Sequence, residues 1–256
     1  MKNLSPSAII RSQARQTLKG NYVAAVSAFV ILLLPVYIII GLSTAIECLL
    51  LVGIDDEVVL GMMKIIFMTP LTIITFVFLS PLFNGYIRLF YNAALTKEFH
   101  VGEMFYYFEG GRYARTLHLN LAYIIRMALP SILCFLPLFV YQMICFGYMS
   151  DFVGTVLYND FAFILTVLSS ILLILYSLKY FLVFTLYCTN EQADNKEIFR
   201  SSKEIMQEQK HSATQLIFSF TPWLLLCLLI LPALYVIPYL TMSLCIGRKW
   251  MTMKGK

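Results

Sequence analysis

Charged residues are scarce in this sequence. Asp, Glu, Lys and Arg make up 13% of its 256 residues, whereas about a quarter of a soluble globular domain is charged. Hydrophobic residues make up 60%, and they gather in five blocks, roughly 22–54, 58–95, 117–149, 152–189 and 213–247. Each block is longer than the ~20 residues that a helix needs to cross a bilayer. The sequence therefore predicts a multi-pass protein of the cell membrane and excludes a soluble one.

The blocks lack the alternation of apolar and polar residues that the strands of a membrane barrel show over about ten residues. They are continuously apolar, which is typical of membrane helices. The first block is also longer than the apolar region of a signal peptide, about 7–15 residues, and has no A-x-A site before its end. We therefore predict an all-α helix bundle whose first block is a retained span.

Lys and Arg are absent from two of the four junctions between blocks. Those two junctions carry only acidic charge, at Asp55, Asp56, Glu57, Asp151 and Asp160. The basic residues instead precede the first block, occupy the other junctions and form the tail. They include Lys2, Arg11, Arg15 and Lys19, Arg88, Lys97, Arg112 and Arg115, Lys196, Arg200, Lys203 and Lys210, and Arg248, Lys249, Lys254 and Lys256. By the positive-inside rule, the basic segments are cytoplasmic and the acidic turns face outward.

The last block decides the number of spans. If residues 213–247 crossed once, the basic tail would lie outside, against every other junction. At ~1.5 Å per residue the block makes about 50 Å of helix, too long for one ~30 Å hydrocarbon core. Pro232 gives a place to break it, because proline lacks an N–H. Trp250, Arg248 and Lys249 would then anchor the chain at the inner interface. We predict six transmembrane helices in three hairpins, with both ends inside.

The predicted organisation is a short N-terminal helix followed by one transmembrane domain. Residues 1–21 form the cytoplasmic amphipathic helix, and residues 22–256 form the transmembrane domain. The cytoplasmic segments within the domain are 87–117 and 190–212. The predicted spans are about 22–46, 62–86, 118–146, 161–189, 213–231 and 233–249.

Two segments outside the spans are amphipathic. In residues 5–22, Arg11, Arg15 and Lys19 recur every four residues and predict a cationic stripe that contacts anionic lipid of the inner leaflet. In residues 194–210, one side of the predicted helix is apolar, and Arg200 and Glu204 are spaced to pair. This second helix fits either a docking site for a cytoplasmic partner or a connector on the membrane surface. Its apolar side consists of Ile198, Phe199, Ile205 and Met206.

Apart from Arg88 and Asp160, which are counted with the junctions above, four charged residues lie within the apolar blocks. Glu47 and Lys64 flank the acidic turn near residue 55, so we expect them to pair near the outer surface. Arg126 lies deeper, about 12 Å from the cytoplasmic end of its span at 1.5 Å per residue, and Lys179 lies at a comparable depth. Two cations at one depth predict a site for an anionic lipid or solute, to which nearby phenols add donors. Those phenols are Tyr123, Tyr176 and Tyr180. The alternative is that both cations extend to the inner headgroups.

Motifs for catalysis or cofactors are absent. The sequence has no phosphate-binding glycine loop, dinucleotide fingerprint, nucleophile elbow or H-E-x-x-H zinc motif. Its six cysteines form no C-x-x-C pair and lie in apolar blocks, as buried free thiols do. We expect a protein that is not an enzyme and that has no metal, no cofactor and no nucleic-acid partner.

Several stretches resemble a known family. They are "LKGNY", "PLFNGYIRLFYNAALTKEFHVGEMFYYF", "YSLKYFLVFTLYCTNE", "SSKEIM", "FSFTPW" and "PYLT", and they run from about residue 10 to 245. In these the chain resembles a bacterial family of six-helix membrane proteins catalogued as domain of unknown function 975. The resemblance implies six helices, and it implies no activity and no site residues.

Two functions remain open from the sequence. The first is an accessory or scaffold protein of the plasma membrane that contacts anionic lipid or a protein partner. The second is a transporter or permease subunit for an anionic or amphiphilic solute, with helices interrupted by proline. Polar residues at mid-membrane are few, which favours the first.

Overall fold

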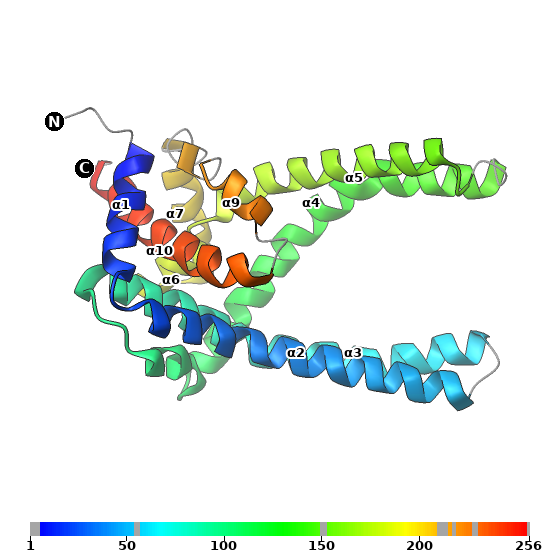
Figure 1. Cartoon of the computed structure of the whole chain (residues 1–256), viewed down its shortest axis with the longest axis horizontal. Coiled ribbons are helices and arrows are strands. Elements are labelled where there is room, and N and C mark those ends of the chain that lie inside the picture. The colour runs from blue at the N-terminus through cyan, green and yellow to red at the C-terminus, as the bar shows by residue number, and fades with distance from the viewer. Residues whose placement is uncertain are drawn as a thin grey trace.

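The computed structural model describes residues 6–53, 57–148, 153–208, 215–216, 219–226 and 230–254. Every regular element in these ranges is helical (Figure 1). The long α-helices are α2 (Tyr22–Gly53), α3 (Glu57–Thr96), α4 (Arg112–Tyr148), α5 (Val156–Ser177) and α10 (Ile230–Lys254). The shorter elements are α1 (Pro6–Leu18), α6 (Val183–Thr189), α7 (Asn195–Glu208), α9 (Thr221–Leu226) and the 3₁₀ helices η1 (Val101–Phe108) and η3 (Leu178–Tyr180). Among the residues discussed above, Lys2, Asp55, Asp56, Asp151, Lys210, Lys256 and one of the six cysteines, Cys227, lie outside the described ranges.

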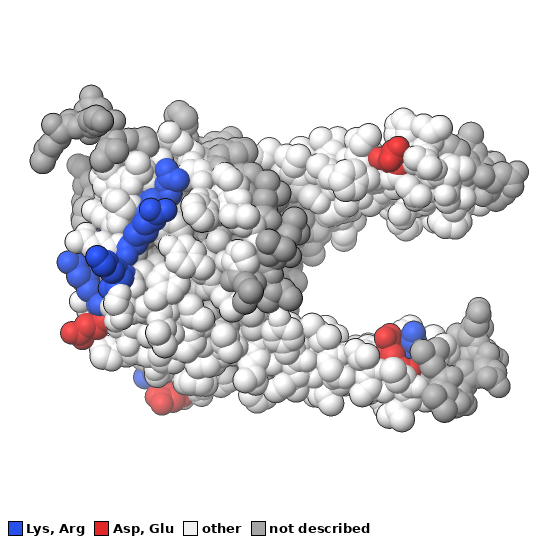
Figure 2. All heavy atoms as spheres, in the orientation of Figure 1, with Lys and Arg blue, Asp and Glu red and all other residues white. Residues whose placement is uncertain are grey.

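Two helical hairpins project from a common body. Helices α2 and α3 pack along each other to form one, and α4 and α5 form the other. Both extend in the same direction and separate toward their tips, leaving an open space between them (Figures 1 and 2). The described ends of the chain, the start of α1 and the end of α10, lie at the opposite end of the molecule.

Four helical segments are long and apolar enough to cross a membrane. They are Tyr22–Leu49, Val59–Thr96, Arg112–Gly147 and Val156–Thr189, and at most 17% of the most apolar window of each is buried. The other two predicted spans, 213–231 and 233–249, are not among these four, and parts of them lie outside the described residues. Helix α10 begins at Ile230, so Pro232 occupies its first turn, where a missing N–H costs no helical hydrogen bond. Six spans stay a prediction.

The body is built around α10 and the inner half of α3. Helix α10 packs on α1, α2 and α3, and its Tyr239, Met242 and Cys245 are buried with Phe90 of α3. Helix α1 contributes Ile10, Ala14 and Leu18, which are among the most buried residues of this core. The apolar side of α1 is therefore covered by its own chain, and the side that remains exposed carries the cationic stripe.

Helix α3 and η1 come together at a glycine. A Cβ at Gly85 would lie 1.9 Å from the backbone oxygen of Met104, closer than any two such atoms can be. Met104 and Tyr107 of η1 are buried by this approach. The aromatic segment 101–108 therefore belongs to the body.

Basic side chains gather over the body, most visibly along α1, with acidic side chains near them, and further acidic side chains mark both hairpins toward their tips (Figure 2). On the α2–α3 hairpin, Lys64 Nζ lies 3.5 Å from Glu47 Oε1, which confirms the pairing that the sequence predicted.

Candidate functional site

Arg126 of α4 is held against α7. Its guanidinium carbon lies 3.9 Å from the centroid of the Phe199 ring, and Nη1 donates to the carbonyl oxygen of Ala122, 3.3 Å away. A cation over a ring face is attracted by the quadrupole of the ring, by about 0.5–2 kcal/mol. Phe199 is only 4% exposed, so the site of this contact is fixed by the packing of α7. Arg126 thus contacts an aromatic face within the protein.

Lys179 lies where the predicted span 161–189 changes its helical geometry. Helix α5 ends at Ser177, η3 covers residues 178–180, and α6 begins at Val183. A 3₁₀ segment within a long helix often marks a functional site or hinge. The Lys179 ammonium nitrogen is 4.4 Å from the centroid of the Tyr176 ring, and its backbone oxygen accepts a hydrogen bond from Ser202 of α7.

Phe199 joins the predicted site residues into one cluster. Its ring is 5.5 Å from that of Tyr180 and 6.5 Å from that of Tyr123, and Tyr180 contacts Tyr176 at 6.1 Å. We call Arg126, Lys179, Tyr123, Tyr176, Tyr180 and Phe199 the cation–aromatic cluster. The sequence analysis found five of these six, but it assigned Phe199 only to the apolar side of a surface helix.

Neither cation of the cluster is neutralised by a carboxylate. The ion pairs in the described part of the chain are Glu47–Lys64, Arg88–Glu103, Arg88–Glu191, Glu98–His100 and Arg200–Glu204. Arg126 and Lys179 contact aromatic rings instead, which leaves two positive charges near one another without a fixed negative charge. Such a pair favours an anionic ligand.

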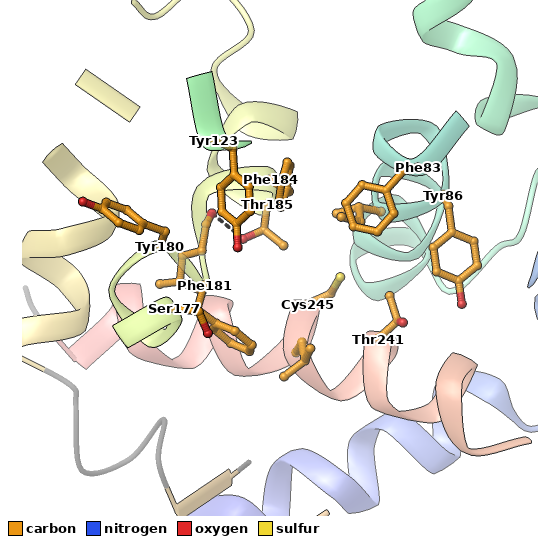
Figure 3. A pocket seen from close by; sticks show the side chains of 13 residues that line it. Phe83, Tyr86, Tyr123, Ser177, Tyr180, Phe181, Phe184, Thr185, Thr241 and Cys245 are labelled. Atoms are coloured by element: carbon orange, nitrogen blue, oxygen red, sulfur yellow. Dashed lines mark hydrogen bonds between the residues drawn. The ribbon is translucent and has the colours of Figure 1, made fainter. Parts of the chain in front are cut away.

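A cavity of about 290 Å³ adjoins the cluster. Tyr123 and Phe184 face Phe83 and Tyr86 across it, and α10 closes one side with Thr241 and Cys245 (Figure 3). Tyr180 stands at the edge, with its hydroxyl pointing away from the cavity. The walls are mainly apolar with a few hydroxyls, which suits a hydrocarbon chain better than a hydrophilic solute.

A second polar cluster was missed by sequence reasoning. Arg88 of α3 bonds both Glu103 of η1 and Glu191, which lies between α6 and α7. The hydroxyls of Tyr106 and Tyr107 also donate to Glu191, at 3.2 and 3.3 Å. The guanidinium carbon of Arg88 also lies 3.5 Å from the centroid of the Tyr106 ring. This Arg88–Glu191 network ties α3 and η1 to the segment between α6 and α7.

The two amphipathic helices are both packed on the body. In α7 the buried side chains are Ile198, Phe199, Ser202 and Met206, and Arg200 Nε donates to Glu204 Oε1 at 2.8 Å, which confirms the predicted face and pair. Because its apolar side lies against η3 and α6, that side is not available for a partner or for lipid.

Helix α1 exposes its stripe, but Arg248 of the basic tail is not the exposed anchor that the sequence predicted. Arg15 and Lys19 are exposed and Arg11 is half-buried, and Arg15 lies 5.6 Å from the centroid of the Tyr239 ring. Arg248 does not extend to an interface. It is 7% exposed and donates to the Thr185 carbonyl and the Thr189 hydroxyl, because α10 passes directly beside α6.

These features define an all-helical protein with four helices long and apolar enough to cross a membrane. In the described residues no three His, Cys, Asp or Glu side chains are grouped so that they could hold a metal ion. The chain belongs to the family described as "Protein of unknown function (DUF975)", whose model matches residues 1–247, and this confirms the resemblance seen in the sequence. No curated protein and no solved structure matches the chain.

Proposed function

We propose that the protein is a non-enzymatic accessory or scaffold protein of the cell membrane that holds an anionic lipid of the cytoplasmic leaflet. The observation that carries the proposal is the pair of cations in the cation–aromatic cluster. Arg126 and Lys179 each lie over an aromatic ring and neither has a carboxylate partner. A phosphate would supply the missing negative charge and accept hydrogen bonds from both.

A lipid fits this position better than a free anion. The cavity beside Tyr123 and Tyr180 is largely apolar and has the volume for part of an acyl chain. The stripe of Arg11, Arg15 and Lys19 adds attraction to a negatively charged leaflet, about 1 kcal/mol for each residue near the surface. With both ends of the chain inside, the stripe and the cluster lie toward the cytoplasmic side.

The proposal is tested by native mass spectrometry of protein extracted gently from its own membrane. We expect the wild type to carry a phospholipid adduct that the Arg126→Ala/Lys179→Ala variant loses. The matched control is Lys196→Ala/Lys203→Ala, which removes the same charge from exposed positions on α7 and should keep the adduct. Equal adducts in all three proteins, or none in the wild type, would contradict the proposal.

The same variants separate lipid holding from transport. A scaffold should keep its co-purifying proteins and show no uptake or export when reconstituted in vesicles of anionic phospholipid. If a small anionic or amphiphilic solute instead crosses those vesicles in the wild type and not in the cluster variant, the protein is a transporter.

A further inference from the structure

A second cavity, of about 300 Å³, lies between α2, α3 and α4, where the two hairpins meet the body. Its walls are Leu32, Leu33 and Val36 of α2, Phe76, Leu79, Ser80 and Phe83 of α3, and Asn120 of α4. Phe83 lines both this cavity and the one beside the cation–aromatic cluster. The lining surface is almost wholly apolar except where Ser80 and Asn120 contribute.

Ser80 differs from other hydroxyl residues of the long helices. Thr72, Thr75, Ser131, Thr166 and Ser170 each donate a hydrogen bond to the carbonyl four residues earlier, at 2.7–2.8 Å. That is the usual way to satisfy a hydroxyl on a helix in an apolar setting. The Ser80 hydroxyl is buried, with the residue 4% exposed, and has no hydrogen-bond partner in the described part of the chain.

Asn84, one turn further along α3, leaves a second polar atom unsatisfied. Its Nδ2 donates to the Ser80 carbonyl at 2.9 Å, but its Oδ1 is buried with no partner among the described residues. Residues four apart share one face of a helix. Ser80, which lines the apolar cavity, therefore has an unused hydroxyl, and Asn84 has an unused acceptor one turn away on the same face of α3.

We propose that this cavity binds the hydroxyl end of an uncharged long-chain lipid alcohol, such as a monoacylglycerol, a diacylglycerol or a polyprenol. A hydroxyl can accept a hydrogen bond from Ser80 and donate one to Asn84, so one group satisfies both atoms. The hydrocarbon chain lies against Leu32, Val36 and Phe76 and continues into the space between the hairpins. No Lys or Arg lines the cavity, which distinguishes its ligand from the anionic lipid proposed for the cation–aromatic cluster.

Depth supports this assignment. Ser80 precedes Arg88 by eight residues, or about 12 Å of helix, and Asn120 follows Arg112 by the same number. Both side chains thus lie about 12 Å from these arginines, toward the tips of the apolar hairpins. A lipid without a charged headgroup can place its hydroxyl at that depth, whereas a phosphate there would lack a counter-ion.

The test uses purified full-length protein in detergent with 1-decanol as the probe and 1-methoxydecane as the matched compound, which keeps the acceptor but lacks the O–H. We expect decanol to raise the unfolding temperature and the ether to bind about tenfold more weakly, as the loss of one buried hydrogen bond implies. Ser80→Ala should bind both compounds about tenfold more weakly, because both keep the oxygen that accepts the hydrogen bond from Ser80. Ser131→Ala, whose hydroxyl is already bonded within α4, should bind both compounds as the wild type does.

Two further measurements keep the test independent of folding. Ser80→Ala should be as stable as the wild type without ligand, because the hydroxyl that it removes has no partner. A decanol that carries a photoreactive diazirine should label residues around 32–36 and 76–83. Equal binding of alcohol and ether by the wild type, an unchanged affinity for both in Ser80→Ala, or a strongly destabilised Ser80→Ala would overturn the proposal. An exchangeable water as the sole occupant would do the same.

Discussion

The hydroxyl of Tyr113 donates a hydrogen bond to the carbonyl oxygen of Val77, 3.2 Å away. Val77 lies four residues before Pro81, which has no N–H to bond that carbonyl. Proline is tolerated in a membrane helix when a neighbouring helix satisfies the freed group. Tyr113 of α4 performs this role for α3, and it also ties the two hairpins together beside the cavity that Ser80 lines.

This contact predicts that the effects of Tyr113→Phe and Pro81→Ala on the free energy of unfolding depend on each other. Tyr113→Phe should lower the free energy of unfolding by about 1 kcal/mol, because the Val77 carbonyl loses its partner. In a Pro81→Ala background the same change should cost less, since alanine restores an N–H that can bond Val77. A double-mutant cycle measured by reversible unfolding in mixed micelles gives the coupling. If Tyr113→Phe costs the same in both backgrounds, the hydroxyl does not replace the missing N–H.

The Arg88–Glu191 network should contribute more to the free energy of unfolding than the Glu47–Lys64 ion pair on the α2–α3 hairpin. Arg88 and Glu191 are 19% and 23% exposed, and Glu191 also accepts from two phenols. Glu191→Ala should therefore lower the free energy of unfolding by about 2 kcal/mol, between the values for exposed and for fully buried pairs. The control is Glu47→Ala, whose pair with Lys64 is 48% and 37% exposed and should cost under about 1 kcal/mol. Equal costs for the two would show that the network adds nothing to a surface pair.

Gly85 should tolerate no side chain. In Gly85→Ala the new Cβ would meet the Met104 backbone oxygen at 1.9 Å, and a backbone group cannot rotate away. We expect η1 to be displaced from α3 at a cost of about 1–3 kcal/mol, with faster proteolysis of residues 101–108. Gly41→Ala and Gly61→Ala are matched controls, because a Cβ at either position meets nothing within 4 Å. These two should be neutral or stabilising by about 0.5–1 kcal/mol, and a similar result for Gly85→Ala would refute the close contact.

What the sequence revealed was local, and what it missed depends on distant contacts. The period of the apolar residues predicted the buried side of α7 and the Arg200–Glu204 pair, because both arise within a few turns of one helix. The same pattern does not predict which residues pack against the buried side of α7. Phe199 meets Arg126, 73 positions away, and Glu191 meets Arg88 across 103 positions. No local pattern encodes either contact.

The places where the helices change direction were also difficult to predict. Proline is the usual marker of a helix break, yet the 3₁₀ segment at 178–180 contains none. The signal there is the Ser202 hydroxyl, which bonds the backbone oxygen of Lys179 from another helix. An apolar line on a helix such as α1 does not tell lipid contact from core contact, because lipid and a protein core bury the same kind of residue. Only the position of α10 shows that Ile10, Ala14 and Leu18 face the core.

Tyr107 should make the protein sensitive to alkali. Burial raises the pKa of the Tyr107 phenol well above its usual range, and the nearby Cys188 and Glu191 raise it further. An exposed tyrosine has a pKa of about 10, so above that pH the unfolded chain releases a proton that the folded protein retains. The free energy of unfolding should then fall with rising pH, by at most about 1.4 kcal/mol per pH unit for this one group.

Tyr107→Phe isolates that contribution, because phenylalanine keeps the ring and has no proton to lose. The variant should be less stable than the wild type at neutral pH, since Glu191 loses the hydrogen bond from the phenol, by about 1 kcal/mol. Its stability should nevertheless decline less steeply above pH ~10, so that the two curves converge. Unfolding by denaturant at a series of pH values, with tyrosinate absorbance recorded on the folded proteins, measures both effects. Parallel curves, or a Tyr107 phenol that ionises together with the exposed tyrosines, would show that its proton is not held by the folded structure.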